Sequence, residues 1–151
     1  AIRGVISETK MIGTAGEYIA MADALEQLIS CQHIHGEPFD LLLFVSGEFI
    51  KVQVKTEKKP LDNRGFSFRP LKGGGRKTKY EVDEVDVFAF VEMTTRQTAW
   101  LSIAETSLSR HTIKPENFQD YTLERALSSH FSMSPMSGIL SNSSQSKVIA
   151  S

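Results

Sequence analysis

The sequence predicts an α/β domain in which a mixed β-sheet is flanked by helices. Three observations indicate this class: an amphipathic helical segment near the start of the chain, four short apolar or alternating runs, and connections rich in glycine and proline. The chain has 151 residues, of which 40% are hydrophobic and 23% charged, a balance typical of a protein with a buried core. We therefore expect one main domain, spanning residues 1–130.

The helical segment covers residues 14–30. Thr14 followed three residues later by Glu17 matches a capping box, which predicts that the helix begins at Thr14. Glu17 lies on the same helical line as Met21, close to the predicted apolar stripe, so we expect its carboxylate to face the sheet. The stripe that we expect to be buried consists of Tyr18, Met21, Ala22, Leu25, Leu28 and Ile29.

Two hairpins account for the predicted strands. Residues 40–45 form a short apolar run typical of a strand buried on both faces, and residues 49–55 alternate polar and apolar side chains. Ser46-Gly47-Glu48 allows a tight turn between them. A second hairpin is expected from residues 86–93 and 98–105. Short helices are predicted near residues 106–109 and 122–130.

Two segments fall outside this regular pattern. Residues 56–79 hold two prolines and four glycines, and a loop of this length in a small domain is usually functional or disordered. Within it, Phe66-Ser67-Phe68 alternates like a short strand. Residues 131–151 contain eight serines and a single charged residue, Lys147. We expect this last segment to be an arm that packs on another subunit of an oligomer.

Positive charge is concentrated in one part of the chain. The net charge is −1, yet residues 51–79 hold ten of the 17 Lys and Arg against two acids, a local net charge of +8 that leaves −9 for the rest. A positive block of this size is typical of a segment that contacts a polyanion.

The composition also bears on the compartment. No apolar run approaches the roughly 20 residues that cross a bilayer, and no charged-then-apolar leader is present. The single cysteine, Cys31, cannot form an internal disulfide, which favours a reducing compartment. We therefore expect a cytoplasmic protein with no membrane partner.

Polar side chains converge in the first predicted hairpin. Gln53 and Lys55 lie two residues apart on one strand, so they share a face. Asp40 opens the neighbouring strand, and the turn places it opposite residues 53–55. Its carboxylate is within reach of Gln53 and Lys55 if it points to their face.

These residue types suit metal-dependent cleavage of a phosphodiester. Asp40 and the carbonyl oxygens of Gln53 and Val54 are hard oxygen ligands of the kind that Mg²⁺ prefers. Lys55 is expected to position or activate the attacking water and to offset phosphate charge. Glu17 is expected to hold water beside the metal.

The order Glu17, Pro38-Phe39-Asp40 and Gln53-Val54-Lys55 resembles the PD-(D/E)xK nuclease superfamily, with Gln53 where Asp or Glu is usual. The resemblance covers roughly residues 10–105. This Gln-x-Lys variant is similar to small bacterial endonuclease-like proteins with a V-Q-V-K strand. It is also similar to the cyanobacterial type of intron-encoded homing endonuclease.

The resemblance implies a restriction-endonuclease-like core and sequence-specific cleavage of both strands of DNA. It implies Mg²⁺ as cofactor, with Mn²⁺ as a substitute, and a homo-oligomer, dimer or tetramer, associated with the nucleoid in a prokaryotic cytosol. Because Gln53 is neutral, it supplies one less negative charge to the metal than Asp or Glu.

The basic segment then has an expected role beside the cleavage site. Lys and Arg neutralise phosphates and release counterions, and arginines also read guanine edges in the major groove. The residues that we expect to bind DNA are Lys58, Lys59, Arg64, Arg69, Lys72, Arg76, Lys77 and Lys79.

Several alternatives stay open. A recombination or repair nuclease of the same fold would share the motif, and an inactive nuclease-like module would bind nucleic acid without cutting it. Glu17 is also explained by helix capping alone, and Lys51 by an exposed strand position. The pattern His33-x-His35-x-Glu37 places two imidazoles on one strand face, but without a further His or Cys nearby it is a weak metal motif.

Overall fold

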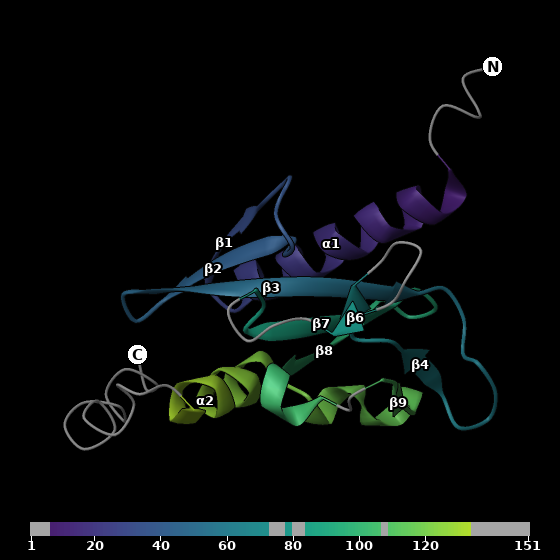
Figure 1. The fold of residues 1–151 in the computed structure, drawn as a ribbon. Coiled ribbons are helices and arrows are strands. Elements are labelled where there is room, and N and C mark those ends of the chain that lie inside the picture. Colours follow the sequence, from purple (N-terminus) through teal and green to yellow (C-terminus); the bar gives the residue numbers. More distant parts are fainter. Residues whose placement is uncertain (1–6, 73–77, 80–83, 107–108, 134–151) are drawn as a thin grey trace.

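The computed structural model of the chain describes residues 7–72, 78–79, 84–106 and 109–133 (Figure 1). The elements, in chain order, are α1 (Glu8–Glu26), β1 (Ser30–His33), β2 (Leu41–Val45), β3 (Glu48–Glu57), β4 (Phe66–Phe68), β5 (Leu71–Lys72), β6 (Thr78–Lys79), β7 (Val87–Glu92), β8 (Gln97–Ser102), the short 3-10 helix η1 (Ile103–Glu105), β9 (His111–Ile113), the 3-10 helix η2 (Pro115–Asp120) and α2 (Leu123–Met133).

The main sheet has five strands in the order β1-β2-β3-β7-β8. Only β3 and β7 pair in parallel, and the other neighbours are antiparallel. Figure 1 shows α1 near β1, β2 and β3 at one edge of this sheet and α2 beyond β8 at the other. The predicted α/β class, a mixed sheet flanked by helices, is therefore confirmed.

The first predicted hairpin is present and its turn follows from local chemistry. Val45 pairs with Glu48, so Ser46 and Gly47 are the two turn residues, with φ angles of 52° and 81°. Two consecutive positive φ angles define the turn type whose twist matches that of paired strands. The register then places Leu41 opposite Val52, which sets the position of the residues just before β2.

The prediction for the first helix is wrong at both ends. The helix begins at Glu8, where the Ser7 hydroxyl accepts a hydrogen bond from the Lys10 N–H at 3.2 Å, and it ends at Glu26. Leu28 adopts a φ of 64° and its side chain is 94% exposed. The chain therefore leaves the helix earlier than the apolar spacing indicates.

The predicted buried stripe is wrong for four of its six members, since Met21 and Ile29 alone among them pack against the core and are partly buried. The residues of α1 that are buried are Gly16, Ala20 and Ala24, whereas Tyr18 and Leu25 are exposed. The helix lies so close to β3 that a Cβ at Gly16 would overlap the Thr56 side chain. Only a helix face made of small residues permits this approach. The size of the side chains, and not their hydrophobicity, therefore determines which face of α1 is buried.

The core occupies both faces of the sheet, and β7 shows how the faces divide. Val87, Ala89 and Val91 point to one face, where α1 and α2 pack. Phe88 and Phe90 point to the other, which β4, β9 and η2 cover. This alternation explains why all six residues of β7 are buried.

The predicted irregular segment 56–79 is partly regular. The strand predicted at Phe66-Ser67-Phe68 is present as β4, and it pairs with β9 in the order Phe66 to Ile113. Gly65 has a φ of 121°, and a side chain there would meet the Ile113 carbonyl, so this position requires glycine. The pairing of β4 with β9 thereby attaches the segment to the second core face, which is the face of the sheet to which Phe88 and Phe90 point.

The second predicted hairpin is confirmed as β7 and β8, although its second strand ends at Ser102 and continues as η1. The helix predicted near 122–130 is present as α2. Of the helix predicted at 106–109, residues 107–108 lie outside the described part of the chain.

Candidate active site

The site is built where β2 begins and β3 continues past it. The Asp40 N–H donates to the Val52 carbonyl at 2.8 Å, and one Asp40 carboxylate oxygen accepts the Val54 N–H at 2.9 Å. Because β2 begins only at Leu41, the carboxylate takes the place of a strand partner for Val54. The N–H and C=O of one strand residue point to the same side, so the Val54 carbonyl also lies past the end of β2.

The Gln53 side chain turns toward the same carbonyl. Its Nε2 donates to the Val54 carbonyl oxygen at 3.3 Å, so the terminal amide lies beside that oxygen. The amide oxygen and nitrogen exchange places by rotation about the last side-chain bond. The Asp40 carboxylate, the Gln53 amide and the Val54 carbonyl therefore lie together where β3 passes the start of β2.

Lys55 follows on the same strand, and its ammonium group has a partner that the sequence does not reveal. Lys55 Nζ donates to the Leu71 carbonyl oxygen at 2.6 Å. Leu71 opens β5, the first strand of the ribbon from which the basic segment continues. The predicted catalytic lysine is thus held by the segment predicted to contact DNA.

Glu17 reaches the site from α1 with the help of His33. Its Oε1 lies 2.5 Å from His33 Nε2. Because α1 begins at Glu8, Glu17 lies in the middle of the helix and the interpretation of Glu17 as a helix cap is wrong. His33 ends β1 and pairs with Leu41, the residue after Asp40. Sequence reasoning missed this role because it predicted no strand at residues 30–33, whereas the alternation of β1 places Cys31 and His33 on one face.

The Asp40 carboxyl is electrostatically unusual. Its pKa is raised from the ordinary 3.8 to about 6, chiefly by burial and also by the negative charge of Glu17. The Val54 N–H, Lys55 and His33 act in the opposite direction. A cation bound at this carboxylate would favour the ionised form.

A cavity of about 530 Å³ between the first turns of α1 and the end of β3 is lined by the four predicted catalytic residues and by Val54. Among its described lining residues are four carboxyl side chains and two lysines. We call it the acidic cavity. Its charged lining residues are Glu8, Glu17, Asp40, Glu57, Lys55 and Lys58.

The oxygen donors fit a hard divalent cation. In the described ranges, no three His, Cys, Asp or Glu side chains come together as a metal-binding group. A metal here would therefore depend on one carboxylate and two neutral oxygens, from Gln53 and the Val54 carbonyl. The His33-x-His35-x-Glu37 motif gains no support, since His33 contacts Glu17.

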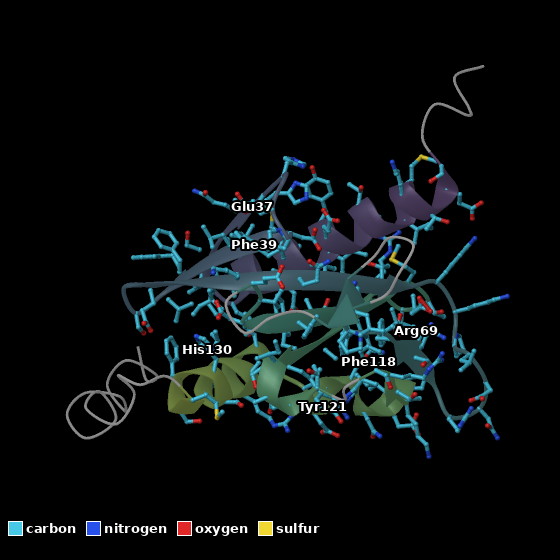
Figure 2. All side chains as sticks on the ribbon, in the orientation of Figure 1. Glu37, Phe39, Arg69, Phe118, Tyr121 and His130 are labelled. Atoms are coloured by element: carbon cyan, nitrogen blue, oxygen red, sulfur yellow. The ribbon has the colours of Figure 1, made fainter. Side chains whose placement is uncertain are left out.

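The structure places four of the predicted DNA-binding side chains. Lys58 forms an exposed ion pair with Glu8 at 2.8 Å, and Lys59 is exposed beside it. The Arg64 side chain donates three hydrogen bonds to the Asp62 carboxylate, the shortest at 2.7 Å. The fourth, Arg69, is exposed, and Figure 2 shows it at the end of the sheet near β4.

The structure does not describe the side chains of the other four residues that we expect to bind DNA. Arg76 and Lys77 lie outside the described residues, and the side chains of Lys72 and Lys79 are not described. Arg110, which sequence reasoning missed, donates a hydrogen bond to the Ser67 hydroxyl, and its positive charge lowers the pKa of Glu57. No local pattern indicates Arg110, because it lies about 40 residues after Arg69 and only the pairing of β4 with β9 brings its strand near.

Comparisons with known proteins agree with this geometry. Residues 7–123 match the PD-(D/E)XK endonuclease family. The fold is similar to that of a bacterial homing endonuclease, I-Ssp6803I, with a TM-score of 0.61 and 18% identity over 71% of this chain and 78% of that one. No curated protein matches the chain. The matched span contains Glu17, Asp40, Gln53 and Lys55, and the resemblance predicted from the motif is confirmed. The chain belongs to the PD-(D/E)XK endonuclease family.

Proposed function

We propose that the chain is an Mg²⁺-dependent endonuclease that cleaves both strands of duplex DNA at a specific sequence. The observation that supports this most directly is the Asp40 carboxylate, which binds the Val54 N–H at the point where β3 passes the end of β2. That contact gathers a carboxylate, a backbone carbonyl and Lys55 at one strand end, in a chain of an endonuclease family.

The metal would be held by Asp40, Gln53 and the Val54 carbonyl. When bound, Mg²⁺ supplies positive charge to the scissile phosphate and lowers the pKa of a coordinated water, and Mn²⁺ supplies the same chemistry. The protein's part is to fix these oxygens. The Val54 N–H holds the Asp40 carboxylate in place, and the rigid strand holds the Val54 carbonyl.

Two further side chains act on the reacting groups. Lys55 presents an ammonium group at the same strand end, where it orients the attacking water and offsets charge that develops on the phosphate. Glu17 presents a carboxylate that accepts a hydrogen bond from that water. His33 keeps Glu17 turned toward the cavity through its 2.5 Å contact.

The biological role that we favour is homing, because the similar structure is a bacterial homing endonuclease. Cutting two strands requires two sites, which leads to an even-numbered homo-oligomer. The described part of the chain holds no helix long and apolar enough to cross a membrane. We place the activity with cytoplasmic DNA. A recombination or repair nuclease would use the same chemistry.

Cleavage assays on duplex DNA with Mg²⁺ test the site. We expect Asp40→Ala and Lys55→Ala to retain DNA binding and to lose cleavage by at least about a hundredfold, as expected for groups that act on the reacting atoms. Lys51→Ala is the matched control, because Lys51 shares the strand and face of Lys55 but does not line the acidic cavity. Equal cleavage by all variants would contradict the assignment.

The same assay separates the remaining candidates. Sequencing the ends produced from a random-sequence DNA library is expected to show one preferred site with paired cuts. Scattered cuts would favour a repair nuclease without sequence preference. Binding without any cleavage, in Mg²⁺ or Mn²⁺, would instead support an inactive DNA-binding module.

A further inference from the structure

A second cavity, of about 640 Å³, adjoins the acidic cavity along the end of β3. Lys55, Thr56, Glu57 and Lys58 line both cavities, so the end of β3 forms a wall that the two cavities share.

The two cavities carry opposite charge. Among the described residues that line the second cavity, five are cationic and one, Glu57, is a carboxylate. We call it the basic cavity, and its cations are Lys55, Lys58, Lys59, Arg69 and Arg110. The acidic cavity, with four carboxyl groups and two lysines, has the reverse balance. One therefore favours a cation and the other an anion.

The arginines of the basic cavity come from two elements that the second core face holds together. Arg110 Nη1 donates to the Ser67 hydroxyl at 2.8 Å, and Ser67 lies on β4 and is only 7% exposed. Arg69 follows β4 directly, while Arg110 precedes β9, the partner of β4. Strand pairing thus places two guanidinium groups on one wall.

Glu57 lies within the electrostatic reach of both arginines. Burial raises the Glu57 pKa, and the positive charges of Arg110 and Arg69 lower it. Glu57, Arg69 and Arg110 all line the basic cavity. A planar guanidinium matches the oxygens of a phosphodiester in a two-point contact, which lysine does not provide.

We propose that Arg69 and Arg110 bind a phosphodiester group of the cleaved DNA strand. This group is the immediate neighbour of the phosphodiester group that is cleaved. The acidic cavity receives the scissile phosphate with its metal, and the basic cavity receives the neighbouring phosphate of the same strand. This inference rests on the proposed function for the identity of the polyanion. The observation that carries it is the basic cavity itself, which adjoins the acidic cavity through four shared residues.

The first test is the salt dependence of DNA affinity, measured by fluorescence anisotropy on a short duplex in Ca²⁺. Each lost phosphate contact lowers the slope of log affinity against log salt by about 0.9. We expect Arg69→Gln and Arg110→Gln each to lower the slope by about this amount, and the double variant by about twice as much.

Arg125→Gln is the matched control, because it removes the same charge from a residue that lines neither cavity. Arg125 lies on α2, where it pairs with Glu105 at 3.2 Å. We expect its slope to equal that of the wild type. Slopes of Arg69→Gln and Arg110→Gln that match Arg125→Gln would overturn the proposal. Should the loss of the Ser67 contact unfold Arg110→Gln, Arg69→Gln alone decides the outcome.

The second test locates the contact on the DNA. A single methylphosphonate, which is neutral, replaces the phosphodiester next to the mapped cleavage position. We expect it to weaken wild-type binding several-fold and to leave the Arg69→Gln/Arg110→Gln double variant unchanged. Unchanged wild-type affinity at both neighbouring positions would overturn the proposal.

The two proposals fail separately. If the wild type does not cleave DNA but the arginine variants have a lower salt slope, the proposed function is contradicted and the phosphate site is supported. If the wild type cleaves DNA and both arginine variants have the same salt slope as the wild type, the proposed function is supported and the phosphate site is contradicted.

Discussion

At the scale of the residue, Asp40 is a partly buried carboxyl that we propose as a ligand of the cation. Its pKa of about 6 in the folded protein exceeds the ordinary value of 3.8, because of burial first and then of Glu17. The folded state therefore binds a proton more tightly than the unfolded state. The resulting stability is complete below pH 4 and is lost as the pH rises through about 6.

We predict from this that Asp40→Asn stabilises the metal-free protein at pH 8. The neutral amide still accepts the Val54 N–H, so the free energy of unfolding should rise by about 1–2 kcal/mol after allowance for solvent screening. Urea unfolding in EDTA at pH 4 and pH 8 measures it. The gain should be absent at pH 4, and an equal gain at both pH values would contradict the electrostatic explanation.

His33 is the residue-scale finding that the motif does not include. We predict that His33→Leu lowers the cleavage rate by about 10–100-fold, the range usual for a residue that orients a catalytic group, with little change in DNA affinity. His33→Gln should recover part of the rate, since its amide can donate to Glu17. Single-turnover rates and binding constants, measured separately, test this. No difference between the two variants would show that only volume matters at this position.

At the scale of the element, the close approach of α1 to β3 positions Glu17. We predict that Gly16→Ala destabilises the protein by about 1–3 kcal/mol and lowers cleavage, because the added methyl overlaps Thr56 and displaces the helix. Gly13→Ala is the control, since a Cβ there meets nothing within 4 Å. That variant should be stabilised by up to about 1 kcal/mol through helix propensity.

Thermal unfolding and cleavage rates of the two alanine variants provide the comparison. If Gly16→Ala unfolds and cleaves like Gly13→Ala, the helix tolerates the displacement and does not set the Glu17 position. The same element shows why the helix prediction was wrong: apolar spacing identifies an amphipathic helix, but it does not show how close the neighbouring strand lies.

At the scale of the whole molecule, cleavage of both strands needs a second copy of the site. We propose residues 1–130 as the nuclease domain and residues 131–151 as an arm that packs on a partner subunit. Since α2 ends at Met133, a chain of residues 1–133 keeps every described helix and strand. We predict that this truncation keeps the melting temperature of the subunit fold and shifts the assembly to monomers.

Light scattering of the full chain and the truncated chain at equal concentration checks the assembly. On supercoiled plasmid, the monomer should nick one strand where the full chain produces linear DNA. A truncated chain that keeps the full oligomer would show that the subunits associate through another surface.

What the sequence by itself determined is local. The hairpin from Asp40 to Lys55 follows from side-chain alternation and from a two-residue turn ending in glycine, and both act over a few residues. The register then brings Asp40 to the end of Gln53-Val54-Lys55, so the motif and its geometry were predictable together. The family was predictable for the same reason.

Only the tertiary structure decided the contacts between distant segments. The buried face of α1 depends on the distance between α1 and β3. The orientation of Glu17 depends on His33 at the end of β1, and the position of Lys55 depends on the Leu71 carbonyl. The placement of Arg110 beside Ser67 depends on the pairing of β4 with β9. Such contacts leave no periodic pattern in the sequence, because they are set by how whole elements pack and not by the residues next to them in the chain.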